Sequence, residues 1–366
     1  MRPSRFIRPD QATGLVLQPR DRAILVSVFK HRFMCSDQLH QVLCPDVSLR
    51  VLQVRLRKLW EHQMLDRHFI PFVLDGVHRP PKRASQPIYS LAPAGAAALD
   101  DESRKESEQL AKLRPAGSAP ALLEHNLVAT DFLVAVEAAS RGHADVQVES
   151  IEAETSLWRK VWSWRQRTGR DTGFIIPDAA VVLRFPATGE RRAFYLEVIR
   201  SDIKGGNRRL LVKLKRYTEL LRRGFFRQAF GHERVRAVLV ATSTEARAQN
   251  LNALAQELAH GRRLFWFGAY EHKDNDGRGV TNFTADTILS PMWKSVDGET
   301  MALAPAAYAA PTPTATPASA QPFTPNPPPS NATSLHPHAT AAGPGEAAHP
   351  RGDNLEGQAP PVWAPA

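Results

Sequence analysis

Two apolar runs joined by a turn stand out in the hydrophobic pattern of this 366-residue chain. Residues 174–185 and 191–200 read as strands, and the turn lies at 186–189. Each run carries one acid, Asp178 or Glu197, where a buried strand would hold an apolar residue. Buried carboxylates are costly unless a cation or hydrogen-bond donors meet them, so these two acids are the first candidates for a functional site.

Helical and strand periods alternate on either side of this pair. A helix that is apolar on nearly every face precedes it, and amphipathic helices and apolar strands follow. The predicted elements are a helix at 122–139, a strand at 146–155, a helix at 204–223, a strand at 235–241, a helix at 245–260 and a strand at 262–267. This order is typical of an α/β domain with a mixed sheet.

A lysine interrupts the apolar stripe of the predicted helix at 204–223. On a helical wheel Lys213 falls inside the stripe that includes Leu210, Leu214 and Tyr217, and the other charges fall outside it or at its edge. A lone lysine that faces a sheet needs an acidic partner or a function. A buried ion pair with one of the two acids and a catalytic role are the alternatives.

The first hundred residues predict three helices followed by a hairpin. The helices begin near residues 21, 36 and 48, and the third has leucines spaced three, four and three residues apart. The hairpin consists of strands at 64–70 and 88–91 around a basic loop at 75–86, and a helix at 93–99 follows it. This order is typical of a winged helix-turn-helix, whose third helix enters the DNA major groove while the wing contacts phosphates.

The charge balance favours an anionic partner. The chain carries a net charge of +10, and its first hundred residues hold 15 Lys and Arg against 8 Asp and Glu. Such a surplus suits nucleic acid first and anionic lipid second. The candidates for contacts to double-stranded DNA are Arg50, Arg55, Arg57 and Lys58 on the third helix, and Arg79, Lys82 and Arg83 on the wing. The alternative is that these are solvated charges on a small domain that binds protein.

A second candidate surface for nucleic acid is the run at 157–167. It holds Trp158, Trp162 and Trp164 among four basic residues. Tryptophans among cations can stack on the bases of single-stranded DNA while the cations neutralise phosphates. Amphipathic packing with the cations extending into solvent is the alternative.

Both ends of the chain differ from the middle. Residues 1–19 form a basic arm, and residues 299–366 are rich in Ala, Pro and Thr, which predicts a disordered tail.

Cys35 and Cys44 show no metal-ligand spacing, so we expect reduced thiols. No apolar run approaches the ~20 residues that span a membrane, and the N-terminus lacks an apolar signal core. We therefore expect a cytoplasmic protein without a membrane partner.

Residues 120–267 resemble the core of the PD-(D/E)XK nuclease superfamily. The motif is Pro177-Asp178 followed by Glu197 on the next strand. The resemblance implies that both acids hold Mg²⁺ and that Glu124 matches an additional acid that some members use. The superfamily lysine two residues after the glutamate is replaced by Ile199, and Lys213 is its best substitute. The resemblance therefore gives Asp178, Glu197, Lys213 and Glu124 as the catalytic set of an active enzyme.

Residues 20–267 also resemble the replication-relaxation family of plasmid and mobile-element proteins. The resemblance runs through Arg20-Asp-Arg-Ala-Ile-Leu25, Arg55-Leu-Arg-Lys-Leu59, Ile88-Tyr-Ser-Leu-Ala-Pro-Ala-Gly95, Glu124-His125, Pro177-Asp178, Leu196-Glu-Val198 and Lys213-Leu-Lys-Arg-Tyr217. It implies a DNA-binding winged helix linked to plasmid replication or mobilisation. His125, which follows Glu124 in this list of motifs, is either a general base or a core histidine that is hydrogen-bonded to the backbone.

The sequence therefore predicts an α/β protein with an N-terminal winged helix-turn-helix and a restriction-endonuclease-like mixed-sheet domain. The predicted parts are the arm at 1–19, the winged helix at 20–100, a linker at 101–120, the nuclease-like domain at 121–298 and the tail at 299–366. Two functions remain. One is a DNA-binding accessory or regulatory protein with a degenerate nuclease-like domain and no cofactor. The other is a Mg²⁺-dependent DNA endonuclease. A homodimer is an additional expectation.

Overall fold

The computed structural model describes residues 7–9, 14–69, 86–99, 105, 120–169, 174–199, 206–258, 260–273 and 279–305. They belong to one compact unit, 1–315, and the second unit, 316–366, lies outside them. The predicted wing contacts Arg79, Lys82 and Arg83, nearly all of the linker, and the tail beyond 305 also lie outside the described residues. No helix in the described ranges is long and apolar enough to cross a membrane.

The N-terminal part contains the predicted helices and hairpin. In order the elements are α1 (Pro19–His31), β1 (Met34–Cys35), α2 (Ser36–Leu43), α3 (Leu49–Glu61), β2 (Leu65–His68), β3 (Ile88–Leu91) and α4 (Pro93–Ala97). The strands form an antiparallel sheet in the order β1-β3-β2, with Leu65 opposite Leu91. Leu52, Leu56 and Leu59 of α3 are buried against α1 and α2, as their spacing predicts.

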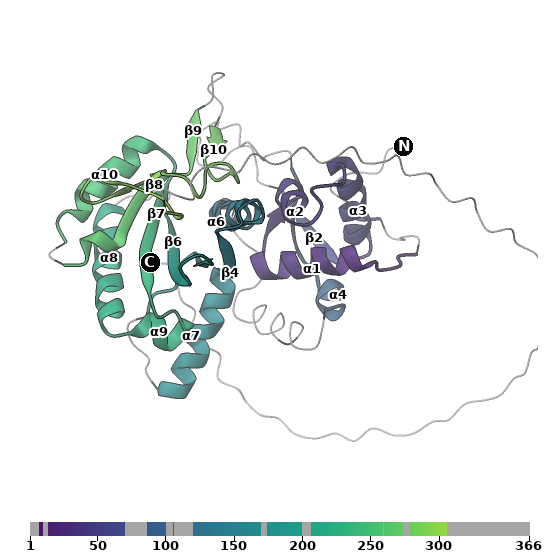
Figure 1. Ribbon diagram of the computed structural model, residues 1–366. Coiled ribbons are helices and arrows are strands. Elements are labelled where there is room, and N and C mark those ends of the chain that lie inside the picture. The colour runs from purple at the N-terminus through teal and green to yellow at the C-terminus, as the bar shows by residue number, and fades with distance from the viewer. Residues whose placement is uncertain are drawn as a thin grey trace, which may run out of the picture. The chain divides into compact units, whose positions relative to one another are not determined.

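The second part is built on a mixed seven-stranded sheet, which confirms the α/β prediction (Figure 1). Its main elements are α6 (Pro120–Arg141), β4 (Gln147–Ala153), α7 (Glu154–Thr168), β5 (Ala179–Phe185), β6 (Glu190–Ile199), α8 (Gly206–Arg222), α9 (Phe225–Phe230), β7 (Val235–Thr242), α10 (Glu245–Ala255) and β8 (Phe265–Ala269). The described residues hold nine α-helices in all. The strand order is β12-β11-β8-β7-β6-β5-β4, in which β6, β7 and β8 are parallel and the other pairs are antiparallel.

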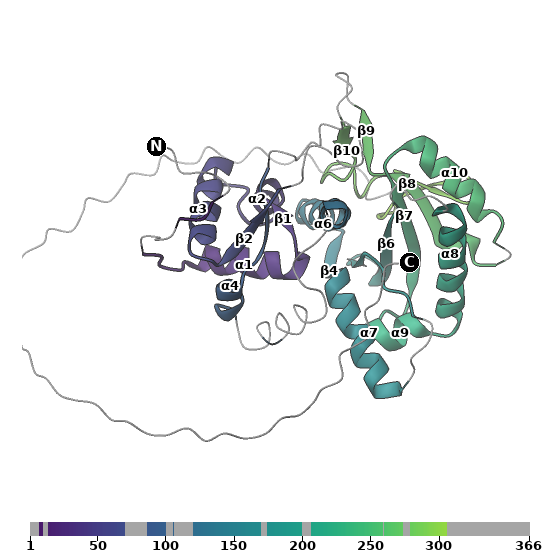
Figure 2. The same ribbon diagram turned by 180° about the vertical axis from the view of Figure 1, so that it is seen from behind.

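Helices cover both faces of this sheet. Figures 1 and 2 show α6 along one face and α8 with α10 along the other. Because side chains alternate along a strand, Phe194 and Leu196 of β6 pack on the α6 side, while Tyr195 packs with the residues of α8. The same alternation turns Glu197 toward α8.

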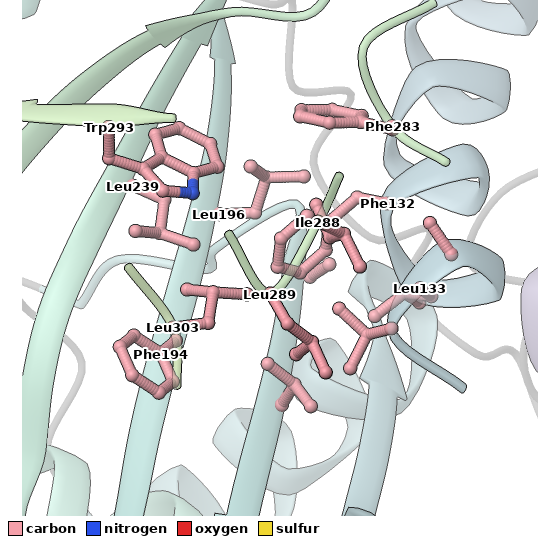
Figure 3. Packing of buried hydrophobic residues seen from close by; sticks show 14 of the residues in the cluster. Phe132, Leu133, Phe194, Leu196, Leu239, Phe283, Ile288, Leu289, Trp293 and Leu303 are labelled. Atoms are coloured by element: carbon pink, nitrogen blue, oxygen red, sulfur yellow. The ribbon is translucent and has the colours of Figure 1, made fainter. Parts of the chain in front are cut away.

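The sheet extends further along the chain than the sequence predicts. After β8, β11 (Trp293–Ser295) and β12 (Thr300–Met301) continue the seven-stranded sheet, while β9 (Glu271–Lys273) and β10 (Gly279–Thr281) form a separate antiparallel pair. Trp293 and Leu303 are buried in the core on the α6 side, in the same cluster as Phe132 of α6, and Phe283 contacts both Trp293 and Phe132 (Figure 3). The boundary predicted at residue 299 therefore lies inside the fold, because a few large apolar side chains here fill the core before the Ala- and Pro-rich sequence begins.

Hydrogen bonds join α6 to the N-terminal part. The Gln38 side-chain amide donates to the backbone carbonyl of Leu127 at 3.2 Å and to Asp131 Oδ1 at 2.8 Å. The Thr130 hydroxyl donates to the carbonyl of Phe33 at 3.3 Å, and Phe33 packs in a small buried cluster with Leu127. The helix that covers the sheet is thus also a wall of the N-terminal core.

We predict that Gly95→Ala destabilises the protein. A Cβ at Gly95 of α4 would lie 2.0 Å from the backbone carbonyl oxygen of Met64, which cannot move independently of β2. We expect a loss of about 2 kcal/mol or more in the free energy of unfolding, although alanine normally favours a helix. The matched control is Gly142→Ala, where the nearest atom is 3.6 Å away. Guanidinium unfolding followed by circular dichroism tests this, and equal midpoints for both variants would contradict it.

Candidate functional site

The strand register brings the two candidate acids together. Ala179 pairs with Leu196 in the antiparallel β5–β6 ladder, so one more residue places Asp178 opposite Glu197. The backbone of Asp178 is held on both sides: its N–H donates to Leu196 O at 3.0 Å, and its carbonyl accepts from the N–H of Glu154 at 3.0 Å. Asp178 thus lies just before β5 rather than within it.

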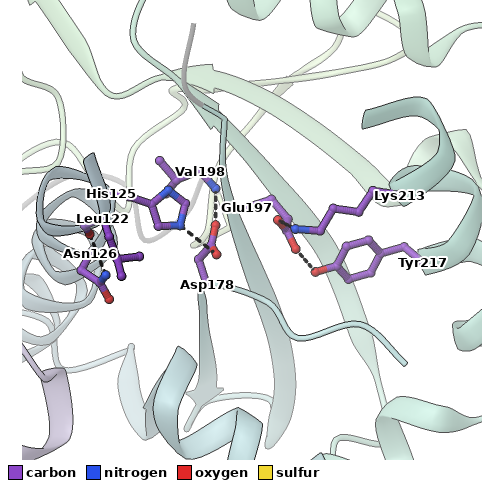
Figure 4. Close-up of polar contacts among 8 residues, drawn as sticks. All are labelled: Leu122, His125, Asn126, Asp178, Glu197, Val198, Lys213 and Tyr217. Atoms are coloured by element: carbon purple, nitrogen blue, oxygen red, sulfur yellow. Dashed lines mark hydrogen bonds and ion pairs between the residues drawn. The ribbon is translucent and has the colours of Figure 1, made fainter. Parts of the chain in front are cut away.

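The Asp178 carboxylate is held by groups from two elements (Figure 4). Its Oδ2 accepts a hydrogen bond from the Val198 N–H at 2.7 Å, and its Oδ1 lies 3.0 Å from Nε2 of His125 on α6. Burial alone would raise the pKa of Asp178, but His125, Lys213 and the Val198 N–H together lower it. Burial likewise opposes protonation of His125, but the charge and hydrogen bond of Asp178, together with the charges of Glu154 and Glu197, raise the histidine pKa. These directions favour a charged Asp178–His125 pair.

The Glu197 carboxylate is held from the other face of the sheet. Its side chain is only 1% exposed. Lys213 Nζ donates to Oε2 and the Tyr217 hydroxyl donates to Oε1. Both donors come from α8, where a spacing of four residues places them on the same face. The side chain of Lys213 is 36% exposed, and Glu197 is the acidic partner that a lysine in the apolar stripe requires.

The pKa directions in this group follow from burial and charge. Burial raises the pKa of Glu197 to about 7, and the neighbouring charge of Asp178 acts in the same direction, while Lys213 and Tyr217 oppose it. Burial would lower the pKa of Lys213, but the two carboxylates outweigh burial and raise it. Burial and Glu197 also raise the pKa of Tyr217 well above its ordinary value. Lys213 is therefore positively charged, and it lies beside the Glu197 carboxylate, which titrates near neutral pH.

The nuclease resemblance implies that Asp178 and Glu197 bind Mg²⁺, which requires oxygens that are available to the metal. All four oxygens of Asp178 and Glu197 already accept from protein donors. Glu124 lies half-buried on α6 beside His125. Across the described ranges, no three His, Cys, Asp or Glu side chains are grouped so as to hold a metal ion. Mg²⁺ needs near-octahedral oxygen ligands, and these carboxylates as arranged do not fit that requirement.

A second buried polar network occupies the same face of the sheet. The Tyr195 hydroxyl lies 2.6 Å from Nδ1 of His232, whose Nε2 lies 3.2 Å from Oε1 of Glu152. Lys160 of α7 contacts the other oxygen of Glu152 at 2.6 Å. Burial would raise the pKa of Glu152, but His232 and Lys160 outweigh it and lower the pKa. Because each member has a partner and Tyr195 is fully buried, this network ties β4, β6 and α7 together.

The predicted DNA contacts on α3 divide into two groups. Arg50, Arg57 and Lys58 lie on its exposed face, and Arg57 also pairs with Glu61 at 2.7 Å. Arg55 instead turns back into the fold, where its Nε donates to the buried Asp21 at 2.6 Å. Burial would raise the pKa of Asp21, but the bond and charge of Arg55, the Gln18 N–H and the charge of Arg20 together lower it. Arg55 therefore satisfies a buried acid and fastens α3 to α1.

The three tryptophans of α7 also differ from one another. Trp164 is buried and packs edge-on against Phe225 of α9 at 5.1 Å. Trp158 and Trp162 stack on each other, and Trp162 is 39% exposed. The sequence did not predict this division. It offered an ion pair with one of the acids as a role for Lys213, and Lys213 does pair with Glu197. It gave His125 as a general base or as a core histidine bonded to the backbone, whereas His125 pairs with Asp178, and it gave Tyr217 only as part of an apolar stripe.

A family model for replication-relaxation proteins matches residues 25–233, which is more than half of the chain. The chain belongs to the replication-relaxation family. The match confirms the resemblance found in the sequence, and it includes α3 and all of the residues around Asp178 and Glu197. No curated protein matches the chain, and no solved structure does.

We predict that Glu197 makes stability depend on pH. Its folded-state pKa of about 7 lies above its ordinary value of 4.5, so its contribution is greatest below pH 4.5 and is lost as pH rises through 7. Relative to Glu197→Gln, the wild type should lose on the order of 1.4 kcal/mol per pH unit in this window. Denaturant unfolding across this pH range measures the difference.

Asp178→Asn provides the opposite control. Because the pKa of Asp178 is lowered in the fold, its contribution is present above its ordinary value of 3.8 and is lost as pH falls. The difference between wild type and Asp178→Asn should therefore grow only as pH rises toward 3.8 and stay constant above it, whereas the difference for Glu197→Gln should shrink between pH 4.5 and 7. Parallel pH curves for the wild type and Glu197→Gln would contradict the assignment.

Proposed function

We propose that this replication-relaxation protein is a DNA-binding accessory or regulatory factor of a plasmid or mobile element. It binds double-stranded DNA through an N-terminal winged helix and acts in replication or mobilisation control. Its second domain is a nuclease-like fold without catalytic activity. Such a protein would act in the cytoplasm, where plasmid DNA resides. The observation that carries the proposal is the outward face of α3.

That face combines the side chains that read base edges. Arg50, Gln53, Val54 and Arg57 are spaced three, four and seven residues from the first, so they share one face, and all four are exposed. Arginine pairs with guanine, glutamine with adenine, and apolar groups contact the thymine methyl in the major groove. Two valines on this face, Val51 and Val54, are more than half exposed, which suits a surface that is covered when DNA binds.

The surrounding elements support the winged-helix assignment. α3 follows α2 after a short turn, and the antiparallel strands β2 and β3 lead toward the basic residues of the predicted wing. The leucines on the opposite side of α3 are buried, so the helix is held by its inner face and presents its outer face. A domain that binds protein would have less need of Arg50 and Arg57 on the outward face of α3.

The state of the acids supports the inactive form of the nuclease-like domain. Lys213 and Tyr217 satisfy Glu197, and His125 and the Val198 N–H satisfy Asp178. An ion pair of this kind accounts for the buried charges without catalysis. The acids would have to exchange their present partners before they could bind Mg²⁺.

One observation favours the alternative, a Mg²⁺-dependent endonuclease. Lys213 reaches Glu197 from α8, although the superfamily position at Ile199 lacks a lysine. Three of the four residues in the predicted catalytic set, Asp178, Glu197 and Lys213, are thus neighbours. In an active enzyme Lys213 would orient the attacking water or stabilise charge on the phosphate.

We expect Arg50→Ala/Arg57→Ala to weaken binding to duplex DNA by about tenfold or more at low salt, because two contacts to phosphates or bases are lost. The slope of log affinity against log salt should fall by about one for each phosphate contact removed. Fluorescence anisotropy with a labelled duplex measures both. The control is Arg263→Ala, whose side chain is 86% exposed and pairs with Asp297 rather than lying on α3. Equal affinities for wild type and the double variant would contradict the proposal.

We expect no metal-dependent nicking of supercoiled plasmid by the full-length protein in Mg²⁺ or Mn²⁺, because the acids are already satisfied by protein groups. Agarose gels of the wild type, Asp178→Ala and Glu197→Ala provide the test. Nicking that requires metal and disappears in both variants would establish the endonuclease instead. Nicking that persists in both variants would point to a contaminating nuclease.

A further inference from the structure

A stacked group of aromatic and cationic side chains lies on the outer side of α7. The rings of Trp158 and Trp162 are 5.6 Å apart with planes inclined by 17°, one helical turn from each other. The Arg165 guanidinium lies over the Trp162 ring at 5.3 Å and over Phe174 at 5.1 Å. We call Trp158, Trp162 and Arg165 the α7 stack.

The core does not require this stack. Leu157, Val161 and Trp164 are the buried residues that fix α7 to the sheet and to α9 (Figure 1). Within α7, whose residues are all described, Trp162 is the one large apolar side chain that is exposed. The exposed Trp162 ring, with Trp158 stacked against it and the Arg165 guanidinium over it, offers an aromatic and cationic surface to a partner.

Charge identifies the class of partner. Besides Lys160, which contacts Glu152, α7 holds Arg159, Arg165 and Arg167 against a single acid, Glu154. An apolar protein partner would need a wider exposed apolar area than one tryptophan ring offers. A strand of unpaired nucleotides matches both properties, because its bases stack on aromatic rings and its phosphates meet cations. Duplex DNA does not expose the faces of its bases to such a ring.

We propose that the α7 stack binds single-stranded DNA. A base stacks on Trp162, and Arg165, a long and flexible side chain, turns from the ring toward the adjoining phosphate. Trp158 supports the Trp162 ring from one turn away and extends the stacking surface. The inference rests on the proposed function, since it gives a DNA-binding protein a second site that is specific for unpaired strand. Trp164, the third tryptophan of the run, anchors the helix and does not contact the strand.

The test uses the full-length protein and two labelled probes, an oligothymidylate and a double-stranded oligonucleotide, in fluorescence anisotropy. Trp162→Ala should weaken oligothymidylate binding on the order of tenfold, because stacking on one aromatic side chain contributes about 1–3 kcal/mol per base. Trp162→Phe should retain most of the affinity, since the ring is preserved. Binding of the duplex should not change in either variant. The matched control is Val212→Ala, which removes an exposed apolar side chain from α8.

The two proposals fail separately in this design. Arg50→Ala/Arg57→Ala should lose duplex binding and keep oligothymidylate binding. If the wild type binds duplex but not oligothymidylate, the α7 stack proposal is overturned and the function proposed for α3 stands. Unchanged oligothymidylate binding in Trp162→Ala, or equal losses for both probes, also overturns it. A change in tryptophan fluorescence that is absent in Trp162→Phe, produced by a proline-rich peptide with the sequence of residues 311–330 and not by oligothymidylate, would assign the stack to the tail of the chain instead.

Discussion

The buried carboxylate of Glu197 is the group whose needs organise the second domain. Without partners, a carboxylate that is almost wholly excluded from solvent would be strongly destabilising. Tyr217 and Lys213 meet its two oxygens from adjacent turns of α8, so the helix is held to the sheet in one axial and rotational position. Asp178, opposite in the strand register, increases the cost of the charge, and His125 offsets that cost from α6. Helices on both faces are therefore tied to one pair of acids.

α6 connects this pair to the N-terminal part. His125 near its beginning contacts Asp178, Thr130 contacts Phe33 between α1 and α2, and Asp131 contacts Gln38 of α2. The same helix also contributes Phe132 and Leu133 to the core of the sheet. The N-terminal part is consequently joined to the α/β part by hydrogen bonds and a buried apolar cluster as well as by chain connection. α6 is thus shared by the N-terminal fold and by the environment of the two acids.

The two surfaces proposed for DNA are built in the same way. On α3 and on α7 a narrow apolar stripe faces inward and satisfies the core. The outward side carries arginines together with apolar groups that the core does not use, Val54 on α3 and Trp162 on α7. The chemistry differs because valine methyls suit base edges in a groove, whereas an indole ring suits the face of an unpaired base.

The sequence by itself determined the elements whose causes are local. Leucine spacing predicted α3. Two apolar runs joined by a turn at 186–189 predicted β5 and β6, and so short a connection leaves antiparallel pairing as the simplest arrangement. The wheel position of Lys213 showed that it would face the sheet. Tertiary structure decided the rest: that Arg55 turns onto Asp21, that His125 meets Asp178, and that Trp162 is exposed while Trp164 is buried. These outcomes depend on groups 34, 53 or 61 positions apart, whose proximity depends on how the whole sheet and its helices pack, and no local pattern carries that information.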